Sequence, residues 1–108
     1  MNKVSIAILL TFVLLLNLAV LFGADAEAGK VFYTKKCKLC HGADGTPPAA
    51  LVKANPSMTA FSSAKFQSLK DPEIKSKITG LPKHKAVSKG MTDEEIANAI
   101  AFLRTLKK

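Results

Sequence analysis

Apolar positions divide the chain into a continuous run near its start and a longer stretch of mixed character. Residues 4–22 are almost entirely apolar, follow a short basic start, and lead to the small residues Ala24 and Ala26. This order is typical of an export signal, which we expect to be cut after Ala26. The run also approaches the roughly 20 apolar residues that cross a bilayer, so an uncleaved anchor is the alternative. We therefore predict a targeting segment over residues 1–26 and one domain over residues 27–108.

Helical spacing of apolar residues marks both ends of the predicted domain. Ala28, Val31 and Phe32 predict a first helix over residues 27–40. A last helix is expected near the C-terminus, because Thr92-Asp93-Glu94-Glu95 reads as a capping box in front of an apolar stripe, with Met91 as its apolar staple. The stripe consists of Ile96, Ala99, Ile100, Leu103 and Leu106.

Turn-forming residues and shorter helical signals fill the region between these two helices. Asp71 as N-cap and Pro72 at the first helical position predict a helix over residues 71–79, and residues 62–69 favour a shorter one. No strand pattern competes with these signals. We therefore predict an all-α fold of three to five helices. Loops rich in glycine, proline and lysine are expected over residues 42–56 and 81–90.

The charge of the chain limits the classes of partner. The formal net charge is +8, and removal of residues 1–26 leaves it unchanged, because that segment holds one basic and one acidic residue. Such a charge favours nucleic acid, a membrane surface or a protein with an acidic face. Export and the lack of an aromatic-rich RNA-binding motif argue against nucleic acid. So short a domain also has a marginal core, which predicts a stabilising metal, cofactor or disulfide.

The candidate chemistry lies in one motif, Cys37-Lys38-Leu39-Cys40-His41, which holds both cysteines of the chain. This spacing is associated with attachment of c-type haem. Residues three apart on a helix lie about 60° apart around its axis, so both sulfurs can face one edge of the porphyrin and form thioethers. His41 follows directly and can bind the iron as proximal ligand.

Three other interpretations of the cysteine pair remain open. A redox-active disulfide of the thioredoxin type would require alternating strands and helices, which the pattern lacks. A zinc site formed by Cys37, Cys40, His41 and His84 has the right number of ligands, but the adjacent pair Cys40 and His41 strains a tetrahedral arrangement. A structural disulfide would close a very small loop and stabilise the fold little.

Beyond the motif, the chain resembles the small class I cytochromes c from residue 27 to residue 108. The resemblance rests on Gly29 and Tyr33 ahead of the motif, on residues 36–42, on residues 92–96, and on Ile100-Ala101-Phe102-Leu103. It implies helices around one covalent haem c, with Phe102 crossing the first helix. It further implies an electron carrier, not an enzyme, that works with redox partner proteins.

The second axial ligand of the iron departs from this family pattern. Where the family commonly has a methionine followed by proline, this chain has Leu81-Pro82, and leucine cannot bind iron. His84, Met91 and, less favourably, Met58 are the candidates, and an open position would permit binding of small molecules. Methionine raises the haem potential relative to histidine, so the identity of the ligand matters for function.

Lysines surround the elements that would carry the haem. They form two groups, one beside the motif and one in the second predicted loop: Lys35, Lys36 and Lys38, and Lys83, Lys85 and Lys89. We expect this basic rim to steer the protein to an acidic docking face on its redox partner. The expected location is the periplasm or another exported compartment. An uncleaved N-terminal segment would tether the domain to the outer face of the inner membrane.

Overall fold

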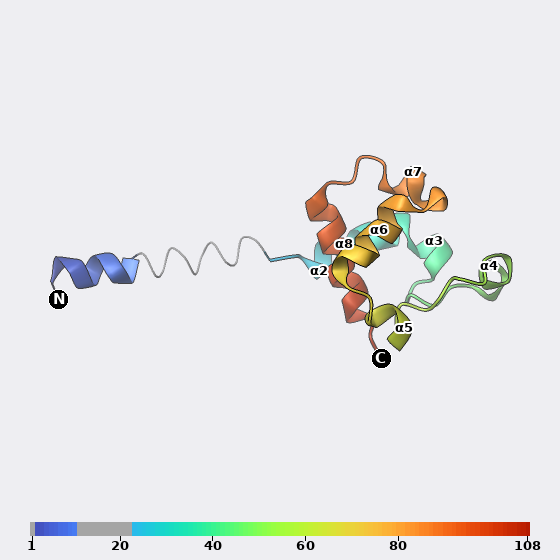
Figure 1. Ribbon diagram of the computed structural model, residues 1–108, viewed down its shortest axis with the longest axis horizontal. Coiled ribbons are helices and arrows are strands. Elements are labelled where there is room, and N and C mark those ends of the chain that lie inside the picture. The colour runs from blue at the N-terminus through green and yellow to red at the C-terminus, as the bar shows by residue number, and fades with distance from the viewer. Residues whose placement is uncertain (1, 11–22) are drawn as a thin grey trace.

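The computed structural model describes residues 2–10 and 23–108 (Figure 1). Three helices of ten or more residues form the frame of the domain: α2 (Ala26–Lys36), α6 (Asp71–Gly80) and α8 (Asp93–Thr105). No described residue is in a strand, so the predicted all-α class is confirmed. Residues 23–108 also form five shorter helices: α3 (Lys38–His41), α4 (Ala49–Ala54), α5 (Ala64–Gln67), η1 (Pro82–His84) and α7 (Lys85–Ser88).

Helices α2 and α8 cross at the centre of the domain (Figure 1). At the crossing, the ring centroids of Tyr33 and Phe102 lie 5.0 Å apart, which is a favourable distance for an aromatic pair. Helix α6 packs against α8 on another side and buries Ile74 completely. The hydrophobic core cluster is therefore built from the three longer helices and α5, and it consists of Tyr33, Phe66, Ile74, Ile96, Ile100, Phe102 and Leu103.

The apolar stripe predicted for the last helix lies in this core. Ile96, Ala99, Ile100 and Leu103 are buried, and Phe102 is buried as well. The start of α8 is also as predicted, because the Thr92 hydroxyl accepts a hydrogen bond of 3.1 Å from the Glu95 backbone N–H. Met91 packs against the core cluster, as expected of an apolar staple.

The first predicted helix is interrupted, so the expectation of one helix over residues 27–40 was wrong. Helix α2 ends at Lys36, Cys37 serves as its C-cap, and α3 begins at Lys38. The Tyr33 hydroxyl donates a hydrogen bond of 2.6 Å to the Gly42 carbonyl. In a straight helix these residues would lie about 13 Å apart along the axis, so the chain must turn to form this bond.

The start of α2 is fixed by Asp25, a residue of the predicted targeting segment. Its carboxylate accepts hydrogen bonds from the backbone N–H groups of Glu27 and Ala28, at 3.0 and 3.2 Å. Its own N–H donates to the Asn98 side chain on α8 at 2.8 Å. Asp25 is thus an N-cap that also contacts the last helix, and the cut expected after Ala26 would remove it.

The N-cap of helix α6 is Lys70, one residue before the predicted Asp71. The Glu73 carboxylate accepts a hydrogen bond of 2.8 Å from the Lys70 N–H, which fixes this register. The Asp71 carboxylate instead pairs with Arg104 of α8 at 2.7 Å. The two predicted loops also contain short helices, because α4 lies in the first and η1 and α7 lie in the second.

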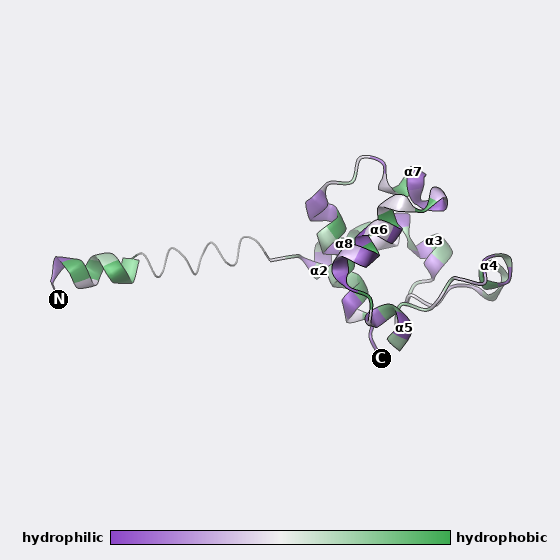
Figure 2. Ribbon diagram, viewed as in Figure 1, coloured by the Kyte–Doolittle hydropathy of each residue, from purple (hydrophilic) through white to green (hydrophobic). Residues whose placement is uncertain are grey.

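The N-terminal apolar run lies largely outside the described residues, because residues 1 and 11–22 are not among them. Residues 3–10 are helical, and Figure 2 colours them mostly as hydrophobic. Val4, Ile8 and Leu10 are exposed in this helix. Over residues 2–10 and 23–108, no helix is both long and apolar enough to cross a membrane.

Candidate functional site

The Cys-x-x-Cys-His motif lies at the turn between α2 and α3. Cys37 is half-buried between the two helices, Cys40 is exposed on α3, and His41 is the last residue of α3. Gly42 follows with φ of 83°, and a Cβ atom there would lie 2.1 Å from the Thr46 carbonyl oxygen. Glycine is therefore required where the chain leaves the motif.

Both cysteines are free thiols in this arrangement. Burial, and next the charge of Cys40, raise the pKa of Cys37 to about 11. A redox-active cysteine pair requires the opposite shift, since the thiolate is the reacting form. The raised pKa of Cys37 therefore argues against a redox-active disulfide of the thioredoxin type.

The His41 imidazole lies against an aromatic cluster. Its ring stacks on Phe61, with centroids 4.7 Å apart and planes inclined by 28°. Phe61 in turn contacts Phe66 at 4.7 Å and Tyr33 at 6.2 Å. Burial, and next the nearby His84, lower the pKa of His41, so the ring is neutral near pH 7. A neutral imidazole is the form that binds metals.

One polar atom of His41 is unsatisfied. Its Nδ1 atom is buried and has no hydrogen-bond partner among the described residues. A buried nitrogen without a partner costs about 1–3 kcal/mol, and such a cost in a native fold points to a functional role or to a missing group.

Phe61 is a residue of the site that the sequence analysis did not single out. Its backbone N–H donates to the Gly45 carbonyl at 3.0 Å, and its carbonyl accepts from the Gln67 amide at 2.7 Å. The same Gln67 amide also donates to Leu103 of α8 at 3.0 Å. These bonds fix the aromatic ring under His41. The only features of the sequence that could have pointed to Phe61 were the glycine at residue 45 and the position of an aromatic residue after a loop.

Among the distal candidates, His84 is in ring contact with the motif histidine. Its ring centroid lies 6.0 Å from that of His41, with the two planes inclined by 50°. The side chain is half-buried, and its Nδ1 atom lies 2.7 Å from the Lys77 carbonyl oxygen at the end of α6. The fold therefore brings together two histidines that are far apart in the sequence.

The two methionines are placed differently. Met91 is half-buried and packs against the hydrophobic core cluster, which accounts for its apolar side chain. Met58 is half-buried in the segment that follows α4. In the part of the chain that the structure describes, no three histidine, cysteine, aspartate or glutamate side chains form a group that could hold a metal ion. The four proposed zinc ligands therefore do not converge.

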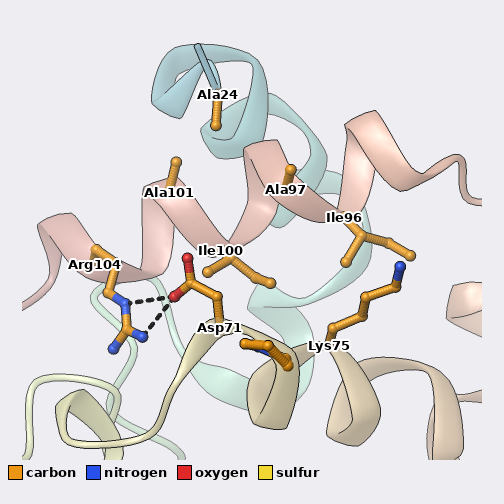
Figure 3. A pocket seen from close by; sticks show the side chains of 9 residues that line it. Ala24, Asp71, Lys75, Ile96, Ala97, Ile100, Ala101 and Arg104 are labelled. Atoms are coloured by element: carbon orange, nitrogen blue, oxygen red, sulfur yellow. Dashed lines mark hydrogen bonds and ion pairs between the residues drawn. The ribbon is translucent and has the colours of Figure 1, made fainter. Parts of the chain in front are cut away.

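A cavity of the domain lies away from these residues. It has a volume of about 440 Å³ and is lined by residues of α6 and α8 together with Ala24 (Figure 3). Arg104 borders it and donates hydrogen bonds to Asp71 and to the Gln67 carbonyl. Neither the motif nor His84 contributes to its lining, and its polar residues are engaged in structural contacts.

The six lysines of the predicted basic rim are exposed. Lys35 and Lys38 line a shallow pocket of about 370 Å³ together with Leu39, whose side chain is 90% exposed. An exposed leucine therefore lies directly beside Cys40, with positively charged lysines around it.

The residues around the motif fit a haem group. Two free thiols could form the thioethers, and neutral His41 could bind the iron. Two metal–nitrogen bonds of about 2 Å, plus about 1.1 Å from each nitrogen to its ring centre, would separate two imidazole centroids by about 6 Å. The observed separation of His41 and His84 is 6.0 Å.

A small all-helical domain with two thiols and a histidine in this order defines the class of proteins that hold haem through their own cysteines. Comparison with protein families identifies which family of that class the chain represents. The model of the family described as cytochrome c matches residues 26–107. The chain belongs to the cytochrome c family. Proteins of this family bind haem c covalently and exchange electrons with redox partners. No curated protein and no solved structure matched the chain.

Proposed function

We propose that this chain is a single-electron carrier with one haem c, bound covalently by Cys37 and Cys40 and ligated by His41. Haem supplies a metal centre that alternates between ferric and ferrous states. The protein holds that centre in place and controls its access to water. No residue of the site acts on a substrate in this proposal.

The observation that carries the proposal is the state of His41. It directly follows Cys40, it is neutral, and its buried Nδ1 atom has no partner. Phe61 stacks on its ring and restricts its rotation. A fixed, neutral imidazole beside two free thiols is suited to a metal centre attached through those thiols.

Attachment can be tested by producing the chain with a c-type haem maturation system and separating it under denaturing conditions. We expect haem to remain bound to the chain, and substitution of both Cys37 and Cys40 by serine to abolish this. Leu39→Ser is the matched control, since it changes the same turn and leaves the motif intact. Loss of haem from the unsubstituted chain on denaturation would overturn the proposal.

We further propose that the protein is exported and that the exported form retains Asp25. The cap that Asp25 forms on α2 and its bond to Asn98 support this, because removal of an N-cap costs about 1 kcal/mol. The intact mass of holoprotein isolated from the exported fraction tests it. A mature chain that begins at Glu27 would contradict retention of Asp25, and holoprotein found in the cytoplasm would contradict export.

The exposed lysines support a partner with an acidic docking face. Leu39 with Lys35 and Lys38 provides an apolar contact within a positive surface next to Cys40. Attraction between opposite charges speeds encounters and weakens as salt screens it.

Oxidation of the reduced holoprotein by small reagents of opposite charge tests this surface. Ferricyanide should react faster at low salt and slow as ionic strength rises, whereas a cationic cobalt complex should show the opposite trend. Lys38→Glu should weaken the salt dependence for ferricyanide more than Lys65→Glu, which changes the net charge equally outside both lysine groups. Equal effects of the two substitutions would argue against a localised docking surface.

A further inference from the structure

The second axial position of the haem iron can be assigned from the surroundings of His84, and this assignment rests on the proposed function. Its ring centroid lies 6.0 Å from that of His41. A single iron bound to one nitrogen of each ring requires about this distance. The spacing between the two imidazoles is therefore already that of a two-histidine metal centre.

The hydrogen bond of His84 defines which of its nitrogens is free. Its Nδ1 atom lies 2.7 Å from the Lys77 carbonyl oxygen, and a carbonyl can only accept a hydrogen bond. Nδ1 must therefore carry the proton and act as the donor. The lone pair is then left on Nε2. Histidines that bind metals usually donate their other ring N–H to a carbonyl or carboxylate in this way, which orients the ring and strengthens the ligand.

The backbone around His84 is fixed on both sides. Helix α6 ends at Gly80, Leu81 is extended, and Pro82 begins the 3₁₀ turn. The His84 N–H donates to the Leu81 carbonyl at 2.9 Å. The neighbouring Lys83 side chain donates to the Asn55 side chain, which ties this turn to the segment after α4. The turn therefore presents His84 from an ordered backbone.

The methionine alternatives have an ordered backbone as well, but among the described residues no hydrogen bond orients their side chains. Met91 packs against the core cluster in front of α8, where an apolar side chain is needed whether or not iron is bound. His84, by contrast, is in ring contact with His41 and is oriented by its bond to the Lys77 carbonyl.

We propose that His84 Nε2 is the second axial ligand of the iron, opposite His41, and that the Lys77 carbonyl is the positioning group for this ligand. The iron of the carrier would then be six-coordinate, with two imidazole ligands and no methionine ligand. Two consequences follow. Its reduction potential is lower than that of the same centre with one methionine ligand, and its reduced form resists carbon monoxide.

The test uses the oxidised and reduced holoprotein, with absorption and electron paramagnetic resonance spectra and a potentiometric titration as readouts. The oxidised protein should be low-spin and lack a sulfur-to-iron charge-transfer band. His84→Met should introduce that band and raise the potential. His84→Ala should give a high-spin centre that binds carbon monoxide when reduced, and added imidazole should restore the low-spin spectrum.

Met91→Leu is the matched control, because it keeps an apolar side chain in the same place and should leave all spectra unchanged. A charge-transfer band in the unsubstituted protein, lost in Met91→Leu or Met58→Leu, would overturn the assignment of His84. A high-spin or carbon monoxide-binding unsubstituted protein would overturn it as well. These results are distinct from failure of the proposed function, in which no haem is retained by the denatured chain. The spectrum of the unsubstituted holoprotein decides the matter even if a His84 variant does not fold.

Discussion

Gly29 of α2 and Asn98 of α8 lie in direct backbone contact at the helix crossing. A Cβ atom on Gly29 would lie 1.9 Å from the Asn98 carbonyl oxygen and 2.5 Å from its carbonyl carbon. Because these are backbone atoms, no side-chain rotation can relieve the overlap. The packing of Tyr33 on Phe102 therefore depends on the absence of a side chain at Gly29.

The first prediction concerns this contact. Gly29→Ala should lower the free energy of unfolding by about 3 kcal/mol, because the helices must separate to admit the methyl group. Urea titration of the holoprotein, followed by circular dichroism, measures the change. Gly80→Ala is the control, since a Cβ atom there meets nothing within 4 Å, and alanine in a helix should stabilise by about 0.5 kcal/mol. Equal destabilisation by both substitutions would contradict the contact.

Tyr33 gives the fold a dependence on alkaline pH. Burial, and next the charge of Cys37, raise the pKa of Tyr33 from 10.0 to about 12, and the larger effect of burial remains when Cys37 forms a thioether. A raised pKa means that the folded state favours the neutral phenol, so its contribution to stability is complete below pH 10. That contribution should decline as pH rises from 10 toward 12. Urea titrations at several pH values should show a steeper decline for the unsubstituted holoprotein than for Tyr33→Phe. Parallel declines would exclude Tyr33 as the cause.

Removal of the Phe61 ring, which stacks on His41, should loosen the orientation of the His41 imidazole and also lower the stability of the core. Phe61→Leu should cost about 1–2 kcal/mol, since it loses the stacking on His41 and the contact with Phe66. The electron paramagnetic resonance spectrum of the oxidised holoprotein should also shift as the imidazole gains freedom. Phe32→Leu is the comparison, because Phe32 has no ring contact with any described residue. An unchanged spectrum in Phe61→Leu would indicate that other contacts orient His41.

Two ion pairs of the domain should differ in how much they contribute to the free energy of unfolding. Arg104 pairs with Asp71 and also donates to the Gln67 carbonyl, and its side chain is 30% exposed. Arg104→Ala should therefore cost about 2 kcal/mol, mainly through carbonyls left without donors. The pair of Lys75 and Asp93 is more exposed, so Lys75→Ala should cost less than about 0.5 kcal/mol. Similar midpoints of thermal unfolding for both variants would refute this ranking.

Much of the fold was predictable because the sequence carries local signals for it. The Thr92 cap and the stripe from Ile96 to Leu103 define α8, and both are found as expected. The break at Cys37 was not predictable from spacing, because it depends on the Tyr33 hydroxyl reaching Gly42. The N-cap of α6 is Lys70 and not the predicted Asp71 for a similar reason, because the Asp71 carboxylate pairs with Arg104. Contacts between distant residues decided both boundaries.

The site was predictable where its residues adjoin in sequence and not where the fold brings them together. Cys37, Cys40 and His41 form one motif. Phe61 carries no chemical signal of its own and takes its place through backbone bonds to Gly45 and Gln67. The proposal of His84 over Met91 also required the fold, because the Lys77 carbonyl that orients His84 lies near the end of another helix.

The position of His84 has a consequence for how the chain folds. In the proposed holoprotein, His41 and His84 both bind the iron, so residues 41 and 84 would be the ends of a closed ring of roughly forty residues. Such a cross-link stabilises a fold by about 4 kcal/mol through reduced entropy of the unfolded chain. The chain contains two histidines, and one of them adjoins the attachment point. No third imidazole therefore competes for the iron in the unfolded protein. Any ring closed by a histidine during refolding is the native one, so refolding avoids traps caused by the wrong histidine.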